Sequence, residues 1–561
     1  MNETDNQEIL LRFMVTSDTH GKFGTWNYAA DCEERSGSMT QICTAVRQYR
    51  TDCSVMIDAG DLFQGNMAEL FVGDEEIHPM IQALNEIGCD IWVTGNHDYD
   101  YGIPRLKKMI SQISAKTLTG NVCDQQGNVL ADGYTVIERN GIRIAVIGMT
   151  TPGISSWNSG ILKGCRVTAP IDETRKILDE LNGNYDMLVG VYHMGPDDQY
   201  GFPHSGVTEI CEAFPGFDLV IAAHTHKLLI TEINGIPVVE NEKTGKTMIV
   251  ADFTYGISKE GWKIKSRDIR SIDISEFEPD PELAEKLTGF DLRAKENARR
   301  KIGRLEGGPL LPDNEISEIP AVLLEDTALM SLIGKVFMHY AGTDTAAVPV
   351  FSNTANINTG DVRYCDAARA YRHENLIYKF RMNGRQLKTY MDWAVSYYNT
   401  FHPGDLTVSF REDLKLYSFA VFKGVEYDVN ISREPGSRIG NLRWPDGTAV
   451  KEDNEFTIAV NDFAANTFLL TPGVIFDEDN IPMLLERDVR DDIGTVREMI
   501  ADYIENVMNG SIQSSTDGNW HLKGCRWDPG LHAEAVRILE KRSAEEKKKL
   551  YFCSFTAADL Q

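Results

Sequence analysis

Residues 91–102 read Ile-Trp-Val-Thr-Gly-Asn-His-Asp-Tyr-Asp-Tyr-Gly, an apolar run that turns at a glycine into a cluster of polar side chains. Gly95 allows the backbone to bend sharply at the end of a strand. Asn96 offers a neutral carbonyl oxygen, His97 a titratable imidazole, and Asp100 a carboxylate that could orient the imidazole. Taken alone, such a string is typical of an ordinary turn, so its meaning depends on the rest of the chain.

The chain around this stretch alternates short apolar runs with amphipathic patterns. We expect strands at residues 11–17, 55–61, 89–93, 142–148, 187–193 and 218–226, and helices at 39–50, 77–87 and 173–182. Strands that alternate with helices at this spacing predict an α/β core.

Beyond residue 262 the pattern changes. Residues 280–305 form a charged, helix-prone stretch that Gly307-Gly308-Pro309 interrupts. A second α/β segment follows, in which we expect helices at 326–341 and 384–398 and strands at 376–382, 417–422, 425–431 and 456–461. The residues from Leu531 to the C-terminus predict one further helix.

The length of 561 residues exceeds what one hydrophobic core usually supports, about 250–300 residues. We therefore expect two domains. The predicted boundaries are 1–270 for the first domain, 271–325 for a linker with a bridging helix, 326–530 for the second domain and 531–561 for a helical tail.

The composition is that of a globular protein with a strongly acidic surface. The 84 acidic and 56 basic residues give a formal net charge of −28, which repels the phosphates of nucleic-acid polymers and anionic lipid. No apolar run approaches the ~20 residues that span a bilayer, so we expect no membrane span.

Ten scattered cysteines without a C-x-x-C pair favour a reducing compartment. Residues 1–8 are acidic and lack the apolar region of a signal peptide. We therefore expect a cytoplasmic location, or a periplasmic or secreted one if the native N-terminus has been trimmed. The sequence does not indicate an oligomeric state.

Seven potential ligands follow the ends of predicted strands: Asp18, His20, Asp61, Asn96, His193, His224 and His226. Individually they are also typical of helix caps, turn aspartates and core histidines. Because ligand sites gather at the carboxyl ends of strands in α/β sheets, we expect them to meet. A mixed His/Asp/Asn set suits Zn, Mn, Co or Fe better than Mg or Ca. One shared aspartate would hold two such ions about 3.5–4 Å apart, a spacing suited to phosphoryl transfer.

The order of the motifs resembles that of the calcineurin-like metallophosphoesterases. The motifs are Asp18-Thr19-His20, Gly60-Asp61-Leu62-Phe63-Gln64-Gly65-Asn66, Gly95-Asn96-His97-Asp98, His193-Met194-Gly195 and His224-Thr225-His226. The whole chain resembles the two-domain nucleotidase branch, which includes 5′-nucleotidases, UDP-sugar hydrolases and 2′,3′-cyclic-nucleotide 2′-phosphodiesterase/3′-nucleotidases. The resemblance implies an N-terminal β-sandwich flanked by helices (α/β/β/α) and an α/β nucleotidase C-terminal domain.

The resemblance also implies roles for individual residues. One metal ion would be held by Asp18, His20, Asp61 and His226, and the other by Asp61, Asn96, His193 and His224. His97 and Asp100 match the catalytic dyad of the family. The implied reaction is hydrolysis of nucleotide phosphate esters, in which a hydroxide bridging the metals attacks phosphorus and His97 stabilises or protonates the leaving oxygen.

In the second domain the resemblance implies a pocket in which two aromatic rings stack on the base. Phe463 matches the second ring, Tyr371 or His373 is nearest to the first, and Asn375 lies in a similar stretch. A core aromatic is the alternative interpretation of Phe463. Residues 352–360 and 464–467 depart from the family pattern, so the substrate cannot be inferred from the resemblance.

Three functions therefore stay open. The first is hydrolysis of nucleotides or 2′,3′-cyclic nucleotides, and the second is hydrolysis of UDP-sugars or other phosphodiesters. The third is a nucleotide-binding protein with an altered pocket and little turnover. Turnover of a nucleotide panel with divalent metal distinguishes them.

Overall fold

The computed structural model describes residues 8–66, 77–157, 162, 164–198, 202–258, 261–352, 355–373, 375–490 and 493–560. The chain divides into two compact units, Met1–Ala298 (unit 1) and Arg299–Gln561 (unit 2). Residues 1–7, on which the predicted location depends, and residues 353–354 of the divergent pocket stretch lie outside the described part.

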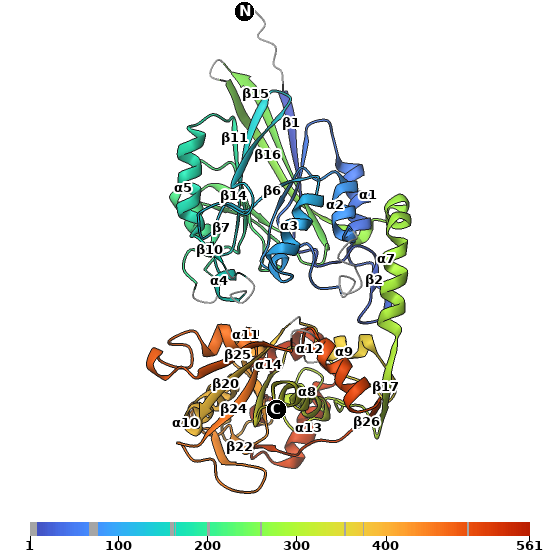
Figure 1. Ribbon diagram of the computed structural model, residues 1–561, viewed down its shortest axis with the longest axis vertical. Helices are drawn as coiled ribbons and strands as arrows, with labels where there is room; N and C mark the ends of the chain where they lie inside the picture. The colour runs from blue at the N-terminus through green and yellow to red at the C-terminus, as the bar shows by residue number, and fades with distance from the viewer. Residues whose placement is uncertain are drawn as a thin grey trace, which may run out of the picture. The chain divides into compact units, whose positions relative to one another are not determined.

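Unit 1 contains two six-stranded sheets (Figure 1). The first has the order β16-β15-β1-β4-β5-β6, with β16 Gly261–Asp273, β15 Thr247–Ser258, β1 Glu8–Thr16, β4 Ser54–Asp58, β5 Ile91–Val93 and β6 Lys116–Leu118. The second has the order β13-β14-β12-β11-β9-β8, with β13 Leu229–Ile233, β14 Ile236–Glu240, β12 Leu219–Ile221, β11 Met187–His193, β9 Ile142–Thr150 and β8 Tyr134–Arg139. Neighbouring strands are parallel from β1 to β6 in the first sheet and from β9 to β14 in the second.

The two sheets pack face to face around one apolar core. Alternate residues of β1, such as Phe13 and Val15, meet residues of β9 and β11, such as Val146 and Val191, in this core. The outer face of the second sheet packs against helices α5 Pro170–Leu181 and α6 Val207–Ala213. Helices α1 Met39–Tyr49 and α2 Pro79–Ile87 lie on the opposite side of the sandwich (Figure 1). The predicted α/β/β/α arrangement is therefore confirmed.

Local sequence sets the ends of the covering helices. The side chain of Ser38 accepts a hydrogen bond from the backbone N–H of Gln41 and so caps the start of α1. Pro79 occupies the first turn of α2, and Gly88 ends that helix with a φ of 68°. The smaller elements of unit 1 are α3 Ile103–Gln112, α4 Ile154–Trp157, and the strand pairs β2 Trp26–Asn27 with β3 Cys32–Glu33 and β7 Val122–Asp124 with β10 Cys165–Val167.

Helix α7, Pro281–Arg299, accounts for most of the predicted bridging helix. Its Asp291 accepts a hydrogen bond from the Tyr28 hydroxyl at 2.9 Å, and the Nζ atom of Lys295 lies 4.1 Å from the ring centroid of Trp26. The prediction of a helix as far as residue 305 was wrong, because strand β17, Lys301–Glu306, replaces its last part. β17 pairs with β19 Gly360–Arg363 and β26 Ser511–Gln513, and these tertiary pairings override the local helix propensity.

Unit 2 is built on a five-stranded sheet with the order β21-β18-β24-β20-β25. These strands are β21 Ala420–Lys423, β18 Thr345–Pro349, β24 Glu455–Asn461, β20 Ile377–Asn383 and β25 Met483–Val489. A separate three-stranded sheet joins β22 Glu426–Asn430 to β23 Ile439–Arg443 and β27 Trp520–Lys523. The helices are α8 Ala328–Ala341, α9 Tyr364–Ala370, α10 Gly384–Ala394, α11 Asp462–Ala464 and α12 Val496–Asp502.

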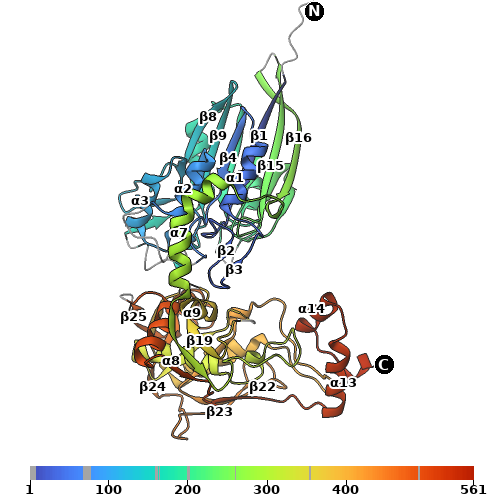
Figure 2. The ribbon, with the colours of Figure 1, turned by 90° about the vertical axis from the view of Figure 1, so that its right-hand side faces the viewer.

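The C-terminal residues form two helices where the sequence predicts one. Helices α13 Pro529–Leu539 and α14 Ala544–Phe552 lie together at one edge of unit 2 (Figure 2). Leu539, Leu550 and Phe555 belong to the apolar core of this unit, so the tail is part of the domain. Among the described residues, no helix is both long and apolar enough to cross a membrane.

Candidate metal centre

Five of the seven predicted ligands have a left-handed backbone conformation, which residues other than glycine rarely adopt. The φ angles are 51° at Asp18, 49° at His20, 54° at Asp61, 78° at His224 and 63° at His226. Each such residue costs roughly 1–3 kcal/mol and persists only where the surrounding structure fixes it. This concentration of backbone strain in the loops after β1, β4 and β12 is typical of a functional site.

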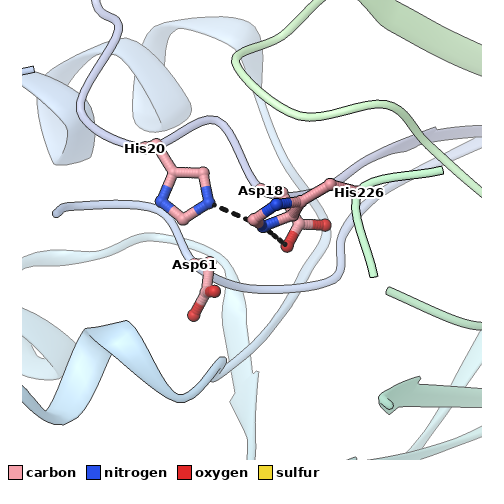
Figure 3. Close-up of side chains that lie close together, drawn as sticks. All are labelled: Asp18, His20, Asp61 and His226. Atoms are coloured by element: carbon pink, nitrogen blue, oxygen red, sulfur yellow. Dashed lines mark hydrogen bonds and ion pairs between the residues drawn. The ribbon is translucent and has the colours of Figure 1, made fainter. Parts of the chain in front are cut away.

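The first ligand group consists of Asp18, His20, Asp61 and His226 (Figure 3). One ligand atom from each lies within 4.8 Å of all the others. The Nε2 atoms of His20 and His226 are 3.1 Å apart, and His226 Nε2 lies 3.4 Å from Asp18 Oδ1. Four donors of this kind at these separations form a set suited to one divalent ion.

The second ligand group consists of Asp61, His193, His224 and Asn96. Ligand atoms of the first three lie within 4.8 Å of one another, and His193 Nε2 is 3.2 Å from Asp61 Oδ2. Asn96 joins them because its Oδ1 lies 2.7 Å from His224 Nδ1. The structure thus brings all seven predicted ligands together, and Asp61 belongs to both groups. The first sheet supplies four of them and the second sheet supplies three.

Hydrogen bonds to backbone carbonyls orient two of the imidazoles. His20 Nδ1 lies 2.9 Å from Gln64 O, and His193 Nδ1 lies 2.7 Å from Ala59 O. Because a carbonyl only accepts, each Nδ1 carries a proton and each ring turns its Nε2 atom into the site. Ligand histidines in metal sites are held in the same way.

A ring nitrogen and a carboxylate oxygen face each other in the second ligand group. His193 Nε2 and Asp61 Oδ2 are buried, and neither has a hydrogen-bond partner among the described residues. A carboxylate oxygen and a ring nitrogen 3.2 Å apart need positive charge between them, which a proton on Nε2 or a bound cation supplies. The residues therefore fit divalent cations.

The pKa values follow from burial and from this crowding of charge. Burial lowers the pKa of His20 to about 4 and, together with the neighbouring His193, that of His224 to about 3, so both rings are neutral and able to bind metal. Burial alone would raise the pKa of Asp61, but His193 and His97 hold it well below its ordinary value. Burial would lower the pKa of His193, but Asp61 and Asp18 outweigh it and raise the value to about 10. The carboxylates thus draw positive charge into the site.

The glycine of the Gly-Asn-His-Asp stretch is required by close approach. A Cβ atom at Gly95 would lie 2.2 Å from Asp61 Oδ1 and 2.7 Å from His193 Cε1. Gly60, with a φ of 101°, packs against the same backbone, since its Cβ would lie 2.4 Å from Gly95 N. The two loops can approach each other this closely only because Gly60 and Gly95 have no side chain.

The predicted dyad lies beside the first ligand group. His97 Nδ1 is 2.8 Å from Asp100 Oδ2, and the His97 ring centroid is 5.6 Å from that of His20. The backbone N–H of His97 donates to Asp61 Oδ1 at 2.8 Å. With Nδ1 directed at Asp100, Nε2 is the ring atom at which a proton can be exchanged with a substrate.

Asp98 has a role that the sequence did not reveal. Its buried carboxylate accepts backbone hydrogen bonds from Gly95 at 2.8 Å, Asp61 at 3.0 Å and Leu62 at 2.9 Å. It thereby ties the loop after β4 to the loop after β5. An aspartate after a histidine is a common turn residue, and no sequence signal shows that it bonds a loop 37 positions away.

Comparison with known proteins agrees with this geometry. The calcineurin-like phosphoesterase family matches residues 11–228, and the 5′-nucleotidase C-terminal domain matches residues 302–468. The chain belongs to the calcineurin-like phosphoesterases that carry a 5′-nucleotidase C-terminal domain. The family and the two-domain fold predicted from the sequence are confirmed.

Relatives of this phosphoesterase align along nearly all of it. A 2′,3′-cyclic-nucleotide 2′-phosphodiesterase/3′-nucleotidase of Haemophilus influenzae is 24% identical over 92% of this chain and 88% of its own length. The trifunctional nucleotide phosphoesterase protein YfkN of Bacillus subtilis is 21% identical over 93% of this chain, which spans only 39% of that protein. A structure of a candidate 5′-nucleotidase from Staphylococcus aureus has the same fold, with a TM-score of 0.76 at 19% identity, covering 92% of this chain and all of that one.

The nucleotidase C-terminal domain of this phosphoesterase contains the predicted pocket residues. Tyr371 is only 2% exposed, and its hydroxyl lies 3.2 Å from both Asn375 Oδ1 and Asn461 Nδ2. Its ring faces are therefore covered, and Asn375 serves to hold it. His373 is exposed and Phe463 is half-buried. Of the two alternatives for the first ring, only His373 has a face that a base could reach.

Phe351 belongs with these rings, although the sequence did not single it out. Its ring centroid lies 4.5 Å from that of His373 and 6.5 Å from that of Phe463. Phe463 also contacts Tyr417 at 5.3 Å. We call Phe351, His373, Tyr417 and Phe463 the aromatic patch. A lone phenylalanine after a strand is most often a core residue, which is why Phe351 was missed.

Proposed function

We propose that this phosphoesterase hydrolyses phosphate esters of nucleotides with the help of two divalent cations. The observation that carries the proposal is the convergence of seven ligand side chains into two groups that share Asp61, next to the His97–Asp100 pair. The nucleotidase C-terminal domain and its half-exposed rings support a nucleotide as the substrate.

Each ligand group would hold one cation. Asp18, His20, Asp61 and His226 would bind the first, and Asp61, Asn96, His193 and His224 the second. A set of nitrogen and oxygen donors of this kind favours Mn, Zn, Co or Fe. When bound, such a pair supplies positive charge for the phosphoryl oxygens and lowers the pKa of water to the neutral range.

His97 would act on the leaving group. Asp100 bonds Nδ1 and fixes the plane of the ring, so that the Nε2–H of the imidazolium can donate its proton to the departing ester oxygen. At 36% exposure, the His97 side chain is accessible to a substrate that enters from solvent. Its position beside the first ligand group is consistent with this role.

The aromatic patch would bind the base. All three rings that contact Phe463 meet it at angles of 65–86°, so among the described residues no neighbour stacks in parallel on its faces. A base could therefore stack on Phe463, with His373 or Phe351 as the second ring. Stacking of this kind tolerates different bases.

Two nucleotide classes fit the proposal. Similarity to a 2′,3′-cyclic-nucleotide 2′-phosphodiesterase/3′-nucleotidase over 92% of the chain supports 2′,3′-cyclic and 3′-nucleotides. The nucleotidase C-terminal domain supports 5′-nucleotides equally.

The test is a substrate panel on the purified chain with Mn²⁺. The panel contains 5′-AMP, 3′-AMP, 2′,3′-cyclic AMP and UDP-glucose, and products are followed by chromatography with and without a chelator. We expect metal-dependent turnover of at least one of the first three. Turnover of UDP-glucose alone would favour the second function. Bound metal without turnover of any substrate would favour a nucleotide-binding protein.

A further inference from the structure

A buried carboxylate lies behind the loop that carries His224 and His226. Glu240, the last residue of β14, has no exposed surface. Its Oε1 accepts two hydrogen bonds from Thr225, one from the backbone N–H at 2.8 Å and one from the hydroxyl at 2.6 Å. Thr225 is the residue between the two histidines, so Glu240 holds the centre of the His224–His226 turn.

Strand pairing brings Glu240 to this position. β12 and β14 are parallel neighbours in the second sheet, with Val220 opposite Val238 and Ile221 opposite Val239. The turn leaves the end of β12, and Glu240 follows Val239 at the end of β14. The carboxylate therefore lies at the carboxyl end of a paired strand, whereas the turn that it bonds extends beyond the sheet.

This turn needs an anchor because both histidines have a strained backbone. The φ angles of 78° at His224 and 63° at His226 each cost roughly 1–3 kcal/mol. The loop after β4 has its own anchor in Asp98, and the loop after β1 is bonded through Asp18 N to Gly60 O at 2.8 Å. For the His224–His226 turn, Glu240 is the side chain that bonds its central residue twice.

We propose that Glu240 is a positioning residue that fixes the His224-Thr225-His226 turn and thereby sets the distances of both histidines to the other ligands. The proposal rests on the function proposed above, in which His224 and His226 bind different cations. With the turn fixed, His226 Nε2 lies 3.4 Å from Asp18 Oδ1 and His224 Nδ1 lies 2.7 Å from Asn96 Oδ1. Glu240 itself does not belong to either ligand group of the described residues.

The chemistry of the contact supports this positioning role, and we call the two hydrogen bonds from Thr225 to Glu240 the clamp. Glu240 Oε1 accepts from both the amide and the hydroxyl of Thr225, so it fixes the central residue of the turn through its backbone and through its side chain. Loss of partners that orient metal ligands usually lowers metal affinity or activity by about 10–100-fold. Glutamine keeps an acceptor oxygen of the same reach, so Glu240→Gln separates the loss of the hydrogen bonds from the loss of the charge.

The experiment compares Glu240→Ala and Glu240→Gln with the wild type. We expect E240A to bind divalent ions about 10–100-fold more weakly by titration with Mn²⁺ or Zn²⁺, whereas E240Q stays close to the wild type. In the metal-free protein, hydrogen exchange at the Thr225 amide should accelerate in E240A and stay slow in E240Q. This second readout does not require metal, so a wild type without bound metal would refute the proposed function while exchange still tests the clamp.

A matched control comes from the other end of β12. The carboxylate of Asp218 accepts the backbone N–H of Leu188 at 2.9 Å, so Asp218→Ala removes a similar contact from the same sheet. D218A should lower the melting temperature without weakening metal binding. If E240A proves insoluble, Thr225→Val removes only the hydroxyl bond and should act in the same direction with a smaller effect.

Three results would overturn the inference. The first is wild-type metal affinity and wild-type exchange at Thr225 in E240A. The second is an equal loss of metal affinity in D218A, which would show a general effect of stability. The third is an E240Q variant as impaired as E240A, because glutamine preserves the acceptor on which the clamp depends.

Discussion

The candidate metal centre of unit 1 and the aromatic patch of unit 2 are held in place by different means. At the metal centre, strained backbone positions are fixed by buried carboxylates and by carbonyls that bond the imidazoles. In the aromatic patch, the ring contacts of Phe463 are edgewise, and none of its residues has a positive φ. Fixed geometry suits chemistry that needs defined distances, whereas stacking on an aromatic ring tolerates different bases.

Removal of Asp61 should have the largest effect, because its carboxylate belongs to both ligand groups. We expect Asp61→Ala to lose both bound ions and to fall to the activity of the chelator-treated wild type. Elemental analysis and the nucleotide panel measure the two effects. Asp218→Ala serves as the control and should keep both ions. Retention of two ions by D61A would contradict the shared-ligand arrangement.

His97 tests whether chemistry can be separated from metal binding. We expect His97→Asn to lower kcat by about 10²–10⁴, the usual contribution of a general acid, while metal content stays at the wild-type level. Steady-state kinetics and elemental analysis of the same preparation decide the matter. Loss of an ion in this variant would mean that His97 is a metal ligand and not the general acid.

Gly95 tests how tightly the centre is packed. A methyl group there would lie 2.2 Å from Asp61 Oδ1, so the loop must shift and distort both ligand groups. We expect Gly95→Ala to weaken metal binding by about 10–100-fold, as measured by titration. The control is Gly216→Ala, where an added Cβ meets nothing within 4 Å. Equal metal affinities in the two variants would show that the loops can shift to accommodate the methyl group without weakening metal binding.

Substitution of Phe463 tests whether the aromatic patch binds the base. Stacking contributes about 1–3 kcal/mol per base, and the half-exposed position suggests the lower end, so Phe463→Ala should raise KM for a nucleotide about 10-fold. Hydrolysis of p-nitrophenyl phosphate, which has no base, should be unchanged. Phe351→Ala and His373→Ala then identify the second ring. An unchanged KM in all three variants would remove the patch from the substrate site.

Tyr371 should give the smallest effect. Tyr371→Phe removes the hydroxyl contacts with Asn375 and Asn461 and should lower the stability of unit 2 by about 1 kcal/mol, with KM unchanged. Thermal denaturation measures the first effect and steady-state kinetics the second. A raised KM in Y371F would show that this buried ring reaches the substrate after all.

The sequence predicted the first domain more fully than the second for a physical reason. Asp18 and Asp61 come shortly after apolar strands, and His193 is the last residue of one. Because parallel strands bring their carboxyl ends to one edge, the local pattern was enough to bring these ligands together. Asp98 and Glu240 could not be predicted, because their roles depend on bonds to loops 37 and 15 positions away. The metal roles themselves stay predictions.

In the second domain the missing information lay in tertiary contacts. Residues 301–305 were assigned to a helix from their propensity, but two partner strands draw them into a sheet. Tyr371 and His373 are two positions apart in sequence, and only the packing of the domain covers one and exposes the other. Phe351 gains its significance from the same packing.

The division of the ligands between two sheets has a consequence for how the protein fails. Asp18, His20, Asp61 and Asn96 follow strands of one sheet. His193 ends a strand of the other sheet, and His224 and His226 follow another strand of it. A slip of about an ångström at the face-to-face interface would scatter the donors while nearly all of the apolar core remained intact. Heat or a distant core substitution should therefore abolish metal binding and activity well below the melting temperature. Retention of metal would then measure how well the two sheets are aligned.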